Sequence, residues 1–164
     1  MNHTIIEENG FKYVEVGEGE VLMLLHGLFG ALSNFYDIIE GFKKTHKVVI
    51  PILPLYDLPI EETTVGGYVN YVERFVAYKG YQKVIVLGNS LGGHIALIYA
   101  LANPDKIKGV VLTGSSGLFE SAMGDSYPKR GDYDYIKKKA ELTFYDPKFA
   151  SKELVDELFD IVND

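Results

Sequence analysis

The sequence predicts an α/β fold: a doubly wound, mostly parallel sheet that opens with an antiparallel N-terminal hairpin. Two observations carry this prediction. Short apolar runs alternate with longer segments of helical periodicity, which is the pattern of parallel strands joined by helices. The first two runs, by contrast, are separated only by Asn9-Gly10, a dipeptide that tolerates positive φ and suits a tight hairpin turn.

The strands are predicted in chain order from these runs. The hairpin pairs residues 4–8 (TIIEE) with residues 11–16 (FKYVEV). Four later runs are almost entirely apolar, as strands covered on both faces require. These are residues 21–25 (VLMLL), 47–53 (KVVIPIL), 83–88 (KVIVLG) and 108–113 (KGVVLT).

Helices are expected between the later runs. Ser33 is a candidate N-cap for a helix over residues 34–43. A second helix begins near Thr64, carries apolar residues at spacings of three and four, and stops at Gly80, a natural C-cap. A third helix, over residues 91–102, is apolar on all sides and is therefore expected to be buried.

The character of the chain changes after Ser115. The next twenty residues are small, polar and rich in glycine, and amphipathic stretches follow at about 133–144 and 151–162. We therefore expect a core over residues 1–115, with six strands, and a separate helical segment over residues 116–164.

The composition argues against several classes of function. Sixteen basic and 23 acidic residues give a formal charge of -7, and no basic run is long enough to track a phosphate backbone, so no nucleic acid is expected as a partner. The chain has no cysteine, which excludes disulfides and thiolate chemistry. No apolar stretch is long enough to cross a bilayer and the start lacks a signal-peptide pattern, so we expect a cytoplasmic protein that binds no membrane.

The sharpest chemical signal is Gly88-Asn89-Ser90-Leu91-Gly92, between a predicted buried strand and a predicted helix. It matches G-x-S-x-G in the strand-turn-helix context in which that motif presents a serine nucleophile. The turn is so sharp that Cβ atoms at the flanking positions would collide, which explains Gly88 and Gly92. The N-terminus of the next helix favours the negative charge that develops during acyl transfer.

A second signal is the motif HGLFG at residues 26–30, which follows the strand VLMLL. Backbone amides of such a turn point across the sheet toward the serine and complete an oxyanion hole. We expect the two donors to be the amides of Leu28 and Leu91. Gly27 supports the turn, and His26 is expected to hold it in shape through a hydrogen bond to the loop backbone.

With these motifs the sequence resembles the α/β-hydrolase family over essentially its whole length. The resemblance implies a Ser90 nucleophile, no cofactor, no metal, and a helical lid inserted after the sixth strand, which residues 116–164 resemble. HGLFG with a serine elbow is most similar to small carboxylesterases and thioesterase-like members, which implies a small-molecule ester substrate and a Ser90 acyl-enzyme. Carbon–carbon bond hydrolases share the G-N-S-x-G-G form and remain an alternative, whereas epoxide hydrolases and haloalkane dehalogenases fit poorly. The family's Asp-hydrophobic-Pro-Gly turn is replaced by YDLPI at residues 56–60.

The sequence lacks the base that a serine nucleophile needs. In this fold the triad runs Ser, then Asp or Glu, then His, and no histidine follows His94. His94 lies one helical turn after Ser90 and is expected to point into helix packing. Four of the aspartates in the second segment are singled out and expected to be solvated surface residues. These are Asp125, Asp132, Asp134 and Asp146.

We therefore expect a chain truncated before the last strands, by about 90 residues for a family member of usual size. Truncation leaves residues 108–113 as an exposed apolar edge. The expected partner is a complementary C-terminal fragment or a swapped copy of the same chain, beside which the chain holds its shape. The triad acid and histidine are expected from sequence that is absent from this chain. The competing hypothesis is a noncatalytic binding or scaffold module, or an inactive fragment, that keeps the fold.

Overall fold

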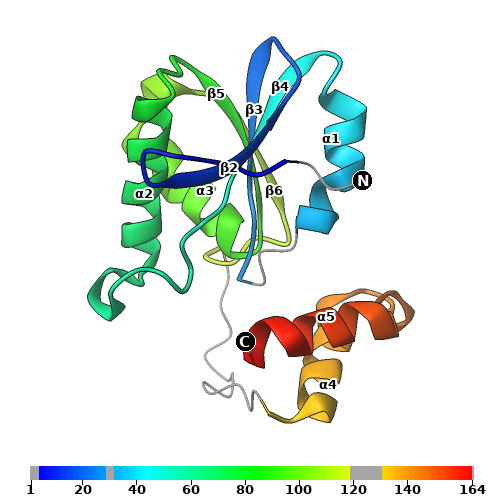
Figure 1. The fold of residues 1–164 in the computed structure, drawn as a ribbon. Helices are drawn as coiled ribbons and strands as arrows, with labels where there is room; N and C mark the ends of the chain where they lie inside the picture. The colour runs from blue at the N-terminus through cyan, green and yellow to red at the C-terminus, as the bar shows by residue number, and fades with distance from the viewer. Residues whose placement is uncertain (1–3, 29–31, 119–130, 164) are drawn as a thin grey trace. The chain divides into compact units, whose positions relative to one another are not determined.

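The computed structural model describes residues 4–28, 32–118 and 131–163 (Figure 1). The chain divides into two compact units, Met1–Glu120 and Ser121–Asp164. The expected change of character after residue 115 precedes this division closely. That the second unit is a lid stays a prediction.

The first unit contains one six-stranded sheet with the strand order β1-β2-β4-β3-β5-β6. β1 and β2 form an antiparallel hairpin, β2 also pairs antiparallel with β4, and the remaining pairs are parallel. The predicted fold class is confirmed. The strands are β1 (Ile6–Glu8), β2 (Phe11–Val16), β3 (Glu20–Leu25), β4 (His46–Pro51), β5 (Val84–Asn89) and β6 (Ile107–Thr113).

The hairpin turn has the geometry that its sequence predicts. Asn9 and Gly10 adopt φ values of 49° and 78°, which is the left-handed region required at both central positions of the preferred two-residue hairpin turn. The turn fixes the register of the hairpin, in which Glu8 lies opposite Phe11.

Three helices connect the strands: α1 (Tyr36–Phe42), α2 (Val65–Tyr78) and α3 (Leu91–Ala102). α2 begins near Thr64 as predicted, and Thr64 caps it, because its hydroxyl accepts a hydrogen bond from the Gly67 amide at 3.1 Å. The predicted Ser33 cap is wrong. Ser33 lies inside a short 3-10 helix, η1 (Leu32–Phe35), and α1 begins after Phe35 without a side-chain cap. Two further 3-10 turns are η2 (Ile60–Glu62) and η3 (Pro104–Lys106).

The helices cover the sheet on both faces (Figure 1). On one face, α2 and α3 bury residues such as Phe75 and Ile95 against Met23 and Val86 of the strands. On the other face, α1 packs Ile39 with strand residues in a smaller cluster. Burial on both faces explains why the central strands are apolar without alternation.

β6 forms one edge of this sheet. Val110 and Val111 point to opposite faces and are 37% and 44% exposed. The predicted exposed apolar edge is therefore confirmed within the part of the chain that the structure describes.

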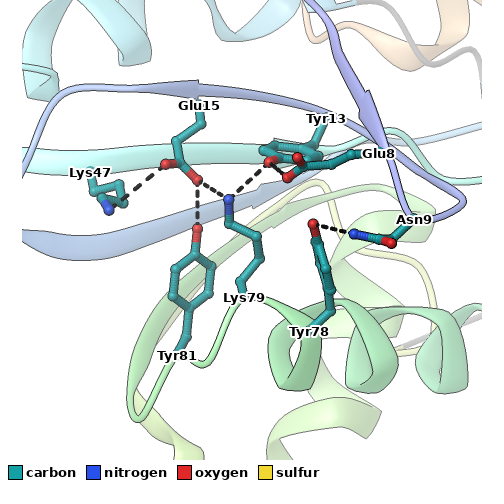
Figure 2. Close-up of polar contacts among 8 residues, drawn as sticks. All are labelled: Glu8, Asn9, Tyr13, Glu15, Lys47, Tyr78, Lys79 and Tyr81. Carbon is teal, nitrogen blue, oxygen red and sulfur yellow. Dashed lines mark hydrogen bonds and ion pairs between the residues drawn. The ribbon is translucent and has the colours of Figure 1, made fainter.

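A polar cluster attaches the N-terminal hairpin to the end of α2 (Figure 2). The Lys79 ammonium lies 2.8 Å from the Glu15 carboxylate and donates to the Tyr13 hydroxyl at 2.9 Å. Tyr81 donates a second hydrogen bond to Glu15, also at 2.8 Å. Burial raises the pKa of the Glu15 carboxyl, but the hydrogen bonds from Lys79 and Tyr81 outweigh it and hold that pKa below its usual value.

The second unit is a helical hairpin of α4 (Tyr133–Thr143) and α5 (Lys152–Asn163), with a 3-10 turn, η4 (Pro147–Phe149), between them. The helices bury one small apolar cluster of Ile136, Ala140, Val155 and Leu158. The two amphipathic stretches predicted here are thus confirmed as helices. Among the described helices of both units, none is long and apolar enough to span a membrane.

Candidate active site

Ser90 occupies a backbone conformation that side chains rarely adopt. It forms the turn between β5 and α3 with φ 52° and ψ -118°. Such conformations are strained for any residue except glycine and persist where surrounding structure enforces them. The turn leaves Ser90 exposed, and its hydroxyl has no hydrogen-bond partner among the described residues. The Ser90 hydroxyl is thus accessible to a substrate, and its role as nucleophile stays a prediction.

The glycines around Ser90 are there because the backbones touch. A Cβ at Gly88 would lie 2.3 Å from the Gly92 carbonyl oxygen, and a Cβ at Gly92 would lie 2.0 Å from the Leu25 carbonyl oxygen. Gly93, which sequence reasoning did not single out, is equally constrained, since a Cβ there would lie 2.5 Å from the Ser115 hydroxyl. The sequence signal for this constraint was a third glycine directly after the G-x-S-x-G motif.

The N-terminus of α3 supplies amide donors beside Ser90. Gly93 and His94 donate their amides to the Ser90 carbonyl at 3.0 and 3.2 Å. Leu91 is the first residue of the helix, a position whose amide has no acceptor within the helix. Its role as an oxyanion donor stays a prediction.

The upstream loop reaches the same turn. A Cβ at Gly27 would lie only 3.2 Å from the Ser90 Cβ, so the loop after β3 lies directly beside the candidate nucleophile. Leu28 follows, with its side chain 56% exposed. Residues 29–31, which include the Phe29 and Gly30 of the predicted motif, lie outside the described residues.

His26 is buried beneath this loop and both of its ring nitrogens are bonded. Nε2 accepts a hydrogen bond from the Leu53 amide at 2.8 Å, and Nδ1 lies 2.8 Å from the Gly27 carbonyl oxygen. Because an amide can only donate, Nε2 carries no proton and Nδ1 is the donor to Gly27. Burial lowers the pKa of His26, although the Gly27 bond opposes the shift, so the neutral ring is favoured.

The segment after β6 forms a third side of the site that the sequence did not reveal. The Ser116 amide donates to the Ser90 carbonyl at 3.2 Å, and the Asn89 side-chain amide donates to the Thr113 carbonyl at 3.1 Å. These bonds join positions 24 to 26 residues apart. No local pattern in residues 114–118 marks this contact in the sequence.

No base for Ser90 is found among the described residues. The His94 ring lies against the segment after β6, because a Cβ at Gly117 would be 2.5 Å from its Cδ2 atom. No hydrogen bond joins that ring to Ser90 within the described part of the chain. In the second unit, Asp132 and Asp146 accept hydrogen bonds from the backbone at the starts of α4 and η4, and Asp125 lies outside the described residues.

The arrangement of a strained serine, a helix N-terminus and a glycine turn agrees with comparison to known families. The family profile described as alpha/beta hydrolase fold matches residues 20–143. The chain belongs to the alpha/beta hydrolase fold family. A curated relative of this alpha/beta hydrolase is the 2-hydroxy-6-oxononadienedioate/2-hydroxy-6-oxononatrienedioate hydrolase of Comamonas testosteroni, 29% identical over 162 residues, covering 86% of the chain and 56% of the relative.

Solved structures give the same fold. An alpha/beta hydrolase enzyme from the metagenome of sediments from the lagoon of Mar Chica, Morocco, has 49% identity and a TM-score of 0.68, over 71% of this chain and 54% of that one. A meta-cleavage product hydrolase superposes with a TM-score of 0.81 at 22% identity, over 99% of this chain and 64% of that one. The chain spans about half the length of the curated relatives it matches, 41% and 56% for two of them.

Proposed function

We propose that this alpha/beta hydrolase cleaves small carboxylic esters through an acyl-enzyme on Ser90. The observation that carries the proposal is the exposed Ser90 in its strained turn, beside both Gly27 and the N-terminus of α3. Residues held in strained backbone conformations cluster at active sites. The proposal needs no metal and no cofactor.

The chemistry divides into two acyl transfers. The Ser90 Oγ attacks the ester carbonyl carbon, its proton passes to a general base, and the carbonyl oxygen becomes an oxyanion that accepts from the Leu28 and Leu91 amides. Collapse of the tetrahedral intermediate expels the alcohol, which takes its proton from the protonated base. Water then attacks the acyl-enzyme by the same route and releases the acid and the free serine.

The base and its orienting carboxylate come, in this proposal, from outside these 164 residues. The support is that no histidine follows His94 in the sequence and that β6 presents an exposed apolar edge. We propose a complementary C-terminal fragment as the source of the base and the carboxylate. An exchanged copy of the same chain would cover the β6 edge but would bring no histidine beyond His94. Intact-mass analysis with light scattering tests this: a co-purifying fragment is expected, and a lone 18.3 kDa monomer contradicts it.

Fluorophosphonate labelling tests the nucleophile. We expect a single adduct on Ser90, read by peptide mass, and no adduct in Ser90→Ala. Ser116→Ala is the matched control, because Ser116 contacts the same turn through the Ser90 carbonyl and is assigned no chemical role. An adduct on another residue contradicts the proposal. Ligand binding without an adduct or turnover supports a noncatalytic module instead.

A second candidate is carbon–carbon bond hydrolysis at the same serine. It is favoured by the similarity to the Comamonas testosteroni hydrolase named above. Parallel assays with p-nitrophenyl acetate and 2-hydroxy-6-oxo-6-phenylhexa-2,4-dienoate separate the two. Faster turnover of the dienoate assigns the carbon–carbon reaction.

A further inference from the structure

Tyr56 is an exposed residue that nonetheless contacts the loop after β3, which carries Gly27 and Leu28 and is called the oxyanion loop below. It belongs to the segment after β4 and is 66% exposed. Its hydroxyl donates a hydrogen bond to the Leu28 carbonyl at 3.3 Å, across 28 positions of sequence. A solvated phenol has no need of a protein partner, so a bond to this particular carbonyl calls for an explanation.

The two peptide groups that flank Leu28 are both held from the carbonyl side. His26 binds the Gly27 carbonyl at 2.8 Å, and Tyr56 binds the Leu28 carbonyl at 3.3 Å. In a planar trans peptide the carbonyl and the amide point in opposite directions. The bond to the Gly27 carbonyl therefore sets the direction of the Leu28 amide, and the bond to the Leu28 carbonyl restrains the next peptide against rotation.

The segment that carries Tyr56 is itself fixed to the core. The Leu53 amide donates to His26 at 2.8 Å. From α2, Tyr71 donates to the Ile52 carbonyl at 3.0 Å and Tyr68 to the Leu55 carbonyl at 3.4 Å. Both α2 tyrosines are about 95% buried, at 4% and 5% exposure. The backbone directly before Tyr56 is therefore held in place by hydrogen bonds to His26 and to α2.

We propose that Tyr56 is a positioning residue for the oxyanion hole: its hydroxyl, on a segment anchored to α2, restrains the peptide after Leu28. This restraint keeps Leu28 in the backbone conformation in which its own amide, directed by the His26 bond to the Gly27 carbonyl, faces Ser90. The inference rests on the proposed function for its catalytic consequence. The tether itself is a property of the fold and can be measured without any reaction.

The test is Tyr56→Phe, which removes one hydroxyl and keeps the ring. The ¹³C chemical shift of the Leu28 carbonyl is expected to move upfield on loss of the hydrogen bond. The first-order rate of fluorophosphonate labelling at saturating probe is expected to fall about two- to tenfold, the effect of one neutral hydrogen bond. The probe concentration for half-maximal rate is expected to stay unchanged, because the aromatic surface remains.

The matched control is Tyr78→Phe, which also removes a phenol that takes part in an exposed hydrogen bond, here from Asn9 at 2.7 Å. It should leave the Leu28 shift and the labelling rate as in the wild type. An unmoved Leu28 shift in Tyr56→Phe overturns the tether, and a moved shift with an unchanged labelling rate overturns the positioning role. If the wild type itself takes no label, the Ser90 proposal fails while the carbonyl shift still decides the tether.

Discussion

Replacing Ser90 by glycine is expected to make the protein more stable, although the same change removes the proposed nucleophile. At φ 52° and ψ -118°, a side chain at this position is strained by roughly 1–3 kcal/mol. Glycine adopts this conformation freely. The hydroxyl has no partner among the described residues, so its loss should be nearly neutral.

The magnitude follows from setting the relief of strain against the greater freedom of the unfolded chain. A glycine destabilises by about 0.5–1 kcal/mol relative to alanine through unfolded-state entropy. Ser90→Gly should therefore exceed Ser90→Ala by about 1 kcal/mol in free energy of unfolding. For a chain of this size that is about 2–4 °C in Tm. Urea denaturation of both variants, followed by far-UV circular dichroism, measures the difference.

Ala77→Gly is the control, because Ala77 lies exposed on α2 with ordinary helical geometry. There glycine should lower stability by about 1 kcal/mol. If Ser90→Gly is less stable than Ser90→Ala by a similar amount, the Ser90 backbone carries no strain. The argument for an enforced turn would then be refuted.

Three further predictions concern the surroundings of the site. Gly92→Ala should lower the free energy of unfolding by about 1–3 kcal/mol, whereas Gly41→Ala, with no atom within 4 Å, should raise it; urea denaturation compares them. NMR of the ring nitrogens should show His26 neutral and protonated on Nδ1. Because burial lowers the pKa of His26, its contribution to the free energy of unfolding is complete above about pH 6.5. That contribution is lost as the pH falls through the pKa of the folded state. Glu15, whose pKa is also lowered, stabilises above about pH 4.3 and loses that contribution on acidification, so Glu15→Gln should flatten the acid limb of the stability profile. A steeper acid limb in that variant contradicts the assignment.

The regular elements were predictable where local signals bracket them. α3 has the predicted limits because the Gly-Asn-Ser-Leu-Gly turn starts it and Pro104 follows its end. β4 ends at Pro51, before the predicted residue 53, because the Leu53 amide bonds to His26 and not to a strand. α1 starts later than predicted because a 3-10 turn takes up Ser33. In the last two cases, contacts that no local pattern encodes decided the boundary.

The residues of the candidate site also fall into a predictable and an unpredictable group. Gly88, Ser90 and Gly92 lie together in the sequence, so one motif sufficed to predict a turn whose backbone contacts the structure displays. Ser116 and Tyr56 reach the same place from other loops. Loop residues follow no hydrophobic period, and a contact across 26 or 28 positions leaves no trace in either segment.

Helix α2 connects two separate segments of the first unit. Its 14 residues span about 21 Å. At its C-terminal end, Tyr78 and the following Lys79 form hydrogen bonds with the N-terminal hairpin. About two to three turns earlier, Tyr68 and Tyr71 form hydrogen bonds with the segment after β4. The hairpin and the segment after β4 are thus both attached to α2, in addition to the direct bond from the Ile52 amide to the Lys12 carbonyl. Unfolding of α2 would therefore release the hairpin contacts and the contacts of the segment that carries Tyr56 together.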